Sequence, residues 1–122
     1  MGRIIHFEIP ADEPDRAVRF YESAFDWKFQ KWDSPMPYWL ASTGPKEQPG
    51  IDGAIMMRQH PGQAVCNVIE VDSLEQAIDA VTKNGGEMIT PILPIPGIGR
   101  YANAKDTEGN VFGMMQPEGA AG

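Results

Sequence analysis

The stretch IIHFEIP, residues 4–10, decides the fold, because its pattern returns as VCNVIEV at residues 65–71. Both copies are apolar and rich in β-branched residues, which is typical of strands. At an offset of 60 residues Ile9 falls on Ile69, and Asp12 after the first copy falls on Asp72 after the second. A repeat of this length is too long for a solenoid, and it predicts two supersecondary units that pack as a pair.

Each copy leads into a helix signal. Acidic residues suited to the first turn follow each strand: Asp12 with Asp15, and Asp72 with Glu75. Apolar side chains then recur at helical spacing: Ala17, Phe20, Tyr21, Ala24 and Phe25 in the first copy, and Leu74, Ala77, Ile78 and Val81 in the second. Gly85-Gly86 ends the second helix, since glycine adopts the left-handed conformation at little cost, and Asp26 stands at the matching place after the first.

Three strand-like segments follow each helix, separated by turns rich in Pro and Gly. They are residues 27–32, 38–42 and 52–58 in the first copy, and 87–92, 100–105 and 110–116 in the second. We therefore predict an α+β fold of two βαβββ modules in a single domain spanning residues 1–122, with the first module at about residues 1–60 and the second at about 61–119. An ordinary α+β fold whose halves match by chance is the alternative, and the shared order of five elements weighs against it.

The composition is that of a globular protein and excludes several classes of partner. The 122 residues suffice for one core but not for two independent ones. A formal net charge of −7 argues against nucleic acid, which binds through clustered Lys and Arg. A single Cys excludes an intrachain disulfide and indicates a reducing compartment, and no apolar run approaches the length of a membrane span. We expect a soluble, cytoplasmic protein with neither nucleic acid nor membrane as a partner.

Two groups of motifs resemble a known family. The first is HFEI at residues 6–9 with Asp12, RA at 16–17, FY at 20–21 and FDW at 25–27; the second is GRY at 99–101 with the turn DTEGN at 106–110. Together they resemble the glyoxalase/bleomycin resistance protein/dioxygenase (vicinal oxygen chelate) superfamily, in particular its small members related to lactoylglutathione lyase. The resemblance covers nearly the whole chain. It implies a glyoxalase-like fold in which paired βαβββ modules form a cupped, open barrel, and a homodimer that binds small molecules in the cup.

The resemblance further implies a divalent metal that acts as a Lewis acid, held by His, Gln or Glu from the first and last strand of each module. His6 stands at the first of these positions. Cys66 stands where the second module would carry a His, and Gly113 where its last strand would carry a ligand. The last-strand position of the first module falls within residues 54–57, which are Ala, Ile, Met and Met. His6 is thus the only retained ligand position. We therefore expect no cofactor, with a divalent metal kept as a disfavoured alternative.

Polar side chains at and beside these positions are the candidates for chemistry. Strand alternation places His6 with Glu8 on one face, and Cys66 with Glu70 on the equivalent face of the second module. A buried carboxylate beside an imidazole can transfer protons, so His6, Glu8 and Glu70 are the candidate catalytic residues. The alternative is that each Glu is solvated or pairs with an arginine near a strand end, the choices being Arg3, Arg58 and Arg100.

Five further residues are candidate ligand contacts. Trp39, Met57 and Tyr101 offer apolar walls, although core packing explains such residues equally well. Arg100 follows a glycine-rich segment and can pair with an anionic ligand. Cys66 is a contact, and it becomes a nucleophile only if a neighbour such as His6 activates it; a lone buried thiol is usually inert.

These observations leave three classes of function. We expect a small-molecule-binding protein without the family's metal, whose ligand the sequence does not name. The alternative is a lyase- or isomerase-type enzyme related to lactoylglutathione lyase, which uses His6 with Glu8 or Glu70, with or without a divalent metal. A purely structural module is the third, and the family resemblance argues against it.

Overall fold

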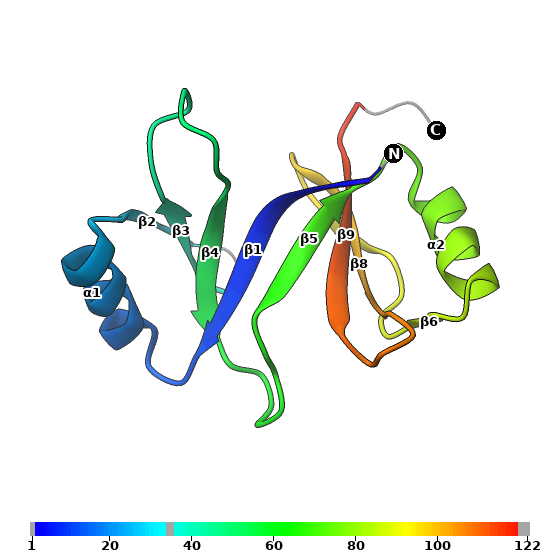
Figure 1. Cartoon of the computed structure of the whole chain (residues 1–122), viewed down its shortest axis with the longest axis horizontal. Coiled ribbons are helices and arrows are strands. Elements are labelled where there is room, and N and C mark those ends of the chain that lie inside the picture. Colours follow the sequence, from blue (N-terminus) through cyan, green and yellow to red (C-terminus); the bar gives the residue numbers. More distant parts are fainter. Residues whose placement is uncertain (1, 34–35, 120–122) are drawn as a thin grey trace. The chain divides into compact units, whose positions relative to one another are not determined.

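The computed structural model describes residues 2–33 and 36–119, which form two compact units. We call His6–Val65 the N-terminal unit, and we call the chain from Cys66 onward, together with residues 2–5, the C-terminal unit. Each unit contains one helix and its own strands, in the same order (Figure 1). The predicted α+β class and the two βαβββ modules are confirmed.

The N-terminal unit is a sheet with one helix. Its elements are β1 (Arg3–Ala11), α1 (Pro14–Phe25), β2 (Lys28–Trp32), β3 (Tyr38–Ser42) and β4 (Asp52–Met57). The strand order is β2-β3-β4-β1, so the first and last strands of the unit are neighbours. These two strands run parallel because α1 connects β1 to the rest of the sheet, whereas β2, β3 and β4 form antiparallel pairs.

The C-terminal unit repeats this plan. Its elements are β5 (Cys66–Glu70), α2 (Leu74–Lys83), β6 (Glu87–Met88), β7 (Leu93–Ile95), β8 (Gly99–Lys105) and β9 (Val111–Pro117). The order is β5-β9-β8-β6, with β5 and β9 parallel and β7 also paired with β8. The first residues of β1 lie beside β5 in this unit.

The strand predicted over residues 87–92 is shorter in the structure, where only β6 at Glu87–Met88 is a strand, and β7 at Leu93–Ile95 lies in the stretch predicted as a turn. The backbone N–H groups of Ile89 and Thr90 both donate to the carbonyl of Asn103, at 2.9 and 3.3 Å, instead of pairing with successive residues. Two residues therefore oppose one, which is the geometry of a β-bulge. Pro91 follows and has no N–H to continue the ladder.

The helices begin one residue later than the acidic signal suggests. Ser73, not Asp72, caps α2, and its hydroxyl accepts from the N–H of Gln76 at 3.2 Å. Pro14 opens α1, where its missing N–H costs nothing. Asp26 ends α1 in the left-handed conformation with φ of 62°, as its alignment with the glycine pair predicts.

Each helix covers one face of its sheet. In the C-terminal unit Leu74 of α2 is fully buried against Ala102, Ala104 and Met114 of β8 and β9. In the N-terminal unit Tyr21 of α1 stacks on Trp27, with 4.6 Å between ring centroids, and Phe7 of β1 meets the same indole at 5.7 Å. The opposite face of each sheet carries no helix of its own unit, and we call it the helix-free face.

Some of the apolar face predicted for the first helix remains uncovered. Phe20 and Phe25 of α1 are 58% and 62% exposed, although both touch other aromatic rings of the unit. Among the described residues, no helix combines the length and apolar character that crossing a membrane requires.

Candidate functional site

His6 and Glu8 share the helix-free face of the N-terminal unit. His6 is paired with Asp52 and Glu8 with Ala54 on the parallel neighbour β4, whereas Phe7 between them faces the helix. Burial lowers the pKa of His6 below 6.5, against the charges of Glu8 and Asp52, which raise it. Since burial is the largest of these effects, the imidazole is neutral at pH 7 and can accept a proton or a hydrogen bond.

Glu8 is an unusual residue for its position. Its side chain lies in the middle of β1 and is only 9% exposed, which is rare for a carboxylate. Two of the arginines considered as its partners are engaged elsewhere: Arg58 donates to Asp12 at 2.9 Å, and Arg100 donates to Glu75. A buried carboxylate two residues along the strand from an imidazole, on the same face, is a chemically competent acid–base pair.

Asp52 is a third titratable group on this face, and the sequence did not single it out. Its Oδ1 accepts from the backbone N–H of Thr43 at 2.9 Å and from the Thr43 hydroxyl at 3.3 Å. These bonds orient the carboxylate at the start of β4, directly opposite His6. Only the register between β1 and β4 reveals this neighbour, because the two residues are far apart in the chain.

The structure separates Trp39 and Met57 from His6 and Glu8. Trp39 is paired with Ile55, and Met57 with Ala11, which puts both on the helix-facing side of the sheet. There the ammonium group of Lys31 makes a cation–π contact with Trp39, 5.3 Å from the ring centroid. The two proposed wall residues therefore do not line the same surface as the candidate acid–base pair.

The C-terminal unit divides its candidates in the same way. Cys66 and Glu70 lie on the helix-free face of β5, whereas Ile69 lies on the other face. Glu70 is paired with Met115, and Met115 with Tyr101, so Tyr101 lies on the same helix-free face. Arg100 points to the helix side. Its guanidinium forms two hydrogen bonds with Glu75 of α2, at 2.7 and 2.8 Å.

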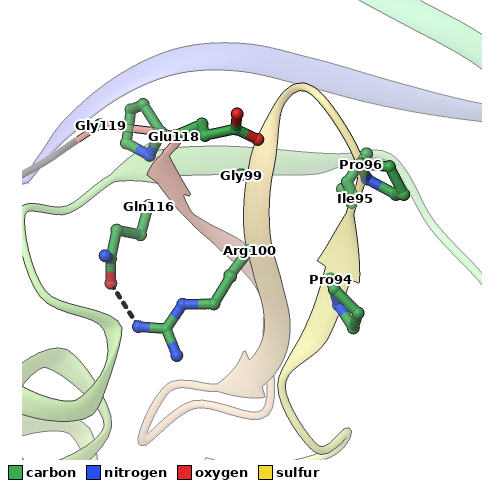
Figure 2. A pocket seen from close by; sticks show the side chains of 9 residues that line it. Pro94, Ile95, Pro96, Gly99, Arg100, Gln116, Glu118 and Gly119 are labelled. Carbon is green, nitrogen blue, oxygen red and sulfur yellow. Dashed lines mark hydrogen bonds between the residues drawn. The ribbon is translucent and has the colours of Figure 1, made fainter.

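Arg100 also lines an open pocket of about 330 Å³ where β8 begins and β9 ends (Figure 2). Gln116 accepts from Arg100 at 2.7 Å through Oε1, and the same oxygen accepts from the backbone N–H of Leu74 at 2.8 Å. Glu118 brings a carboxylate to the pocket. Because Glu75 already neutralises the guanidinium, Arg100 acts here chiefly as a tie between the sheet and α2.

Strand register identifies the family's last-strand ligand position in the N-terminal unit. Glu8 and Val68 are equivalent at the offset of 60 residues; Glu8 lies opposite Ala54, and Val68 lies opposite Gly113. The equivalent of Gly113 is therefore Ala54, on the helix-free face. Neither Ala54 nor Gly113 has a donor atom. Among the described residues, no three His, Cys, Asp or Glu side chains gather in an arrangement able to hold a metal ion.

Position 113 lacks a metal-binding side chain, and it also has no space for one. A Cβ placed on Gly113 would lie 2.7 and 2.8 Å from ring carbons of Tyr101 and still closer to the phenol oxygen. The residues present therefore do not fit the family's metal. They define an α+β protein of paired βαβββ units that retains an imidazole and a buried carboxylate on one sheet face.

Comparison with known proteins agrees with this fold. Residues 3–114 match the family model described as the Glyoxalase/Bleomycin resistance protein/Dioxygenase superfamily. A glyoxylase-like domain-containing protein of Didymella fabae is 32% identical to this chain, with 97% of this chain and 96% of that protein covered. The chain belongs to the glyoxalase/bleomycin resistance protein/dioxygenase superfamily.

More distant relatives show how widely the fold is used. A putative glyoxylase of Mycobacterium tuberculosis, CFP32, is 27% identical over 95% of this chain, which spans 44% of that protein. A hypothetical protein of Bacillus halodurans, BH1468, has a TM-score of 0.75 at 17% identity, with 99% and 98% of the two chains covered. Streptomyces coelicolor methylmalonyl-CoA epimerase, solved with 2-nitronate-propionyl-CoA, has a TM-score of 0.73 at 11% identity, with 98% and 97% covered. At these identities the solved structures share the fold alone.

Proposed function

We propose that this protein binds a small organic molecule without the family's divalent metal, through the helix-free face of the N-terminal unit. The observation that carries the proposal is the contrast between positions on that face. Ala54 supplies no side-chain donor where the family coordinates a metal, yet His6 stands at a ligand position of the family with the buried Glu8 beside it. A few polar groups that converge beside apolar side chains are what a small-molecule site requires.

The roles of the two side chains follow from their charge. The neutral imidazole of His6 accepts a hydrogen bond at one nitrogen and donates at the other, so it suits a hydroxyl or a carbonyl oxygen. Glu8 accepts hydrogen bonds when ionised, so it suits a hydroxyl or amide donor of the same molecule. A ligand with neighbouring oxygen functions matches this pair.

The proposal is tested by metal analysis and by ligand screening of the purified protein. We expect elemental analysis to find no stoichiometric divalent metal. We expect a thermal-shift screen of small oxygen-rich metabolites to yield compounds that stabilise the wild type, and His6→Ala to weaken their binding about tenfold or more, the loss of one good polar contact. Lys83→Ala, at the exposed end of α2, is the control and should bind as the wild type does.

Two results would contradict this function. The first is a stoichiometric metal in the wild type that disappears on His6→Ala. The second is a set of bound compounds whose affinity is the same in the wild type, His6→Ala and Glu8→Gln.

The helix-free face of the C-terminal unit carries the remaining candidate contacts, which are Cys66, Glu70 and Tyr101. We include them in the proposal as ligand contacts, and Glu70 also as a candidate proton acceptor. Their strand positions support this, because they stand at or beside the positions from which the family binds its ligands. Cys66→Ser, Glu70→Gln and Tyr101→Phe enter the same screen as single variants.

A second candidate function is proton transfer by a lyase- or isomerase-type enzyme. The specific observation in its favour is an imidazole of lowered pKa placed on one face with the carboxylates of Glu8 and Asp52. Such a group of bases can remove a proton next to a carbonyl and return it. Compounds from the screen are incubated with the protein in deuterated water, and mass spectrometry reads the deuterium taken up at carbon.

If the protein is an enzyme of this type, the compound should take up deuterium in the presence of the wild type and of Lys83→Ala. Uptake should be slow or absent with His6→Ala and Glu8→Gln. Binding without any incorporation would leave the first function standing and reject the second.

We also propose that the chain forms a homodimer. The support lies on α1, where Phe20 and Phe25 expose most of their rings to solvent. Large exposed apolar side chains grouped on one surface are typical of protein interfaces.

A further inference from the structure

Gly113 of β9 and Tyr101 of β8 compete for one space on the helix-free face of the C-terminal unit. A Cβ on Gly113 would lie 2.7 Å from Cζ and 2.8 Å from Cε2 of Tyr101. Non-bonded carbon atoms settle at about 3.5–4.0 Å. No side chain is therefore accommodated at position 113 while the ring stays in its place.

The ring of Tyr101 is held where it is by Asn103. The side-chain amide of Asn103 donates to the phenol oxygen at 3.1 Å, and Asn103 lies directly opposite Gly113 in the pairing of β8 with β9. The backbone of Asn103 is in turn fixed by the bulge, since its N–H donates to the Thr90 hydroxyl at 3.0 Å and its carbonyl accepts from Ile89 and Thr90. Moving the ring thus disturbs a connected set of hydrogen bonds.

A metal-binding side chain at position 113 would have a second metal ligand within its reach. Gly113 is paired with Val68, and Cys66 lies two residues before Val68 on the same face of β5. Side chains on diagonal positions of neighbouring strands can meet. A carboxylate at position 113 and the Cys66 thiolate could then bind one metal ion together.

We propose that Tyr101 determines the binding preference of this face, because its ring fills the volume in which a metal-coordinating side chain of β9 would stand. The inference rests on the proposed function and gives it a structural cause within the C-terminal unit. The face is thereby specialised for an organic molecule rather than for a divalent cation.

The test is a double-mutant cycle between positions 101 and 113, with Co²⁺ as the probe. Gly113→Glu alone should lower the melting temperature by about 5 °C or more, because overpacking a filled site is destabilising. Tyr101→Ala combined with Gly113→Glu should lose clearly less than the sum of the two single changes. If Gly113→Glu does not fold, Gly113→Ala replaces it in the stability cycle, because it adds only the clashing Cβ.

The control separates the ring from its hydroxyl. Tyr101→Phe retains the ring carbons that lie 2.7 and 2.8 Å from the added Cβ, so Tyr101→Phe with Gly113→Glu should stay as unstable as Gly113→Glu alone. Cys66 is the only cysteine in the sequence, so a near-ultraviolet thiolate-to-Co²⁺ absorption band reports on it alone. We expect this band only in Tyr101→Ala with Gly113→Glu, and we expect Cys66→Ser to abolish it.

Several outcomes would overturn the inference. They are a Gly113→Glu variant as stable as the wild type, additive effects in the cycle, rescue by Tyr101→Phe, a Co²⁺ band in Gly113→Glu alone, or no band in the Tyr101→Ala and Gly113→Glu pair. Failure of the proposed function is distinct from all of these. It would appear as a metal in the wild type that depends on His6, whereas the cycle is decided at positions 101 and 113.

Discussion

Arg100 and Glu75 are joined by two parallel hydrogen bonds, of 2.7 Å from Nη1 to Oε2 and 2.8 Å from Nη2 to Oε1. The pair ties β8 to the first turn of α2. Arg100 also donates to Gln116, whose oxygen accepts from the first backbone N–H of the helix. This bidentate geometry is the strongest that an exposed ion pair adopts.

The ion pair predicts an acid-dependent loss of stability. The hydrogen bonds from Arg100 lower the pKa of Glu75 from 4.5 to about 2. A carboxylate with a lowered folded-state pKa stabilises the fold above the pKa of the unfolded chain, and this stabilisation is lost as the pH falls from 4.5 through 2. Urea unfolding of the wild type and Glu75→Gln should therefore differ most above pH 4.5 and converge toward pH 2. A difference that does not change with pH would contradict the assignment.

His6 should titrate below the usual value of 6.5, because burial opposes its charged form. Its folded-state pKa is lowered, so protonation favours the unfolded chain, and stability should decrease as the pH falls below 6.5 until the lowered pKa is passed. Proton NMR of the imidazole measures the pKa directly. Glu8→Gln should lower it further, since the Glu8 charge raises it. His60→Gln, in the loop after β4, is the control and should leave the titration of His6 unchanged.

Leu74 should be among the most sensitive core positions. Its side chain is 0% exposed between α2 and strands β8 and β9. Leu74→Ala should cost about 2–5 kcal/mol in the free energy of unfolding, because it removes buried contacts and leaves a cavity. Leu93 of β7 is 46% exposed and provides a matched control, for which the same substitution should cost much less. Equal losses measured by chemical denaturation would refute this account of the core.

Sedimentation equilibrium at micromolar concentration should give twice the 13.4 kDa mass of the chain. Phe25 is 62% exposed, so replacing it with Glu should leave the fold intact. The new charge would have to be buried in the interface, which should shift the mass toward the monomer. Circular dichroism checks the fold of the variant. A wild-type protein that sediments only as the monomer would reject the dimer.

The elements of the fold were predictable because their signals are local. Helical spacing in the stretches after Asp12 and Asp72, and the Pro- and Gly-rich turns between strands, depend on residues close together in the chain. The early end of β6 was missed, because the bulge depends on the carbonyl of Asn103 from another strand. The one-residue offset in the cap of α2 has a local cause, since Ser73 competes with Asp72 for the same role.

The candidate site was predictable only within single strands. Alternation along β1 sufficed to put His6 and Glu8 on one face, and the same rule united Cys66 with Glu70. It could not relate residues on different strands, because a shift of one residue in register moves a whole strand to the other face. For that reason the sequence groups Trp39 and Met57 with His6, whereas the register places them on the helix-facing side of the sheet.

The sequence by itself determined the order of the two βαβββ units and the loss of donor atoms at the family's ligand positions. Both are properties of residue type and of spacing along the chain. Only the tertiary structure decided that Asp52 stands beside His6, that Arg100 is engaged by Glu75, and that Tyr101 covers Gly113. These relationships arise from hydrogen-bonded pairing and packing between segments distant in sequence, and no pattern within one segment encodes them.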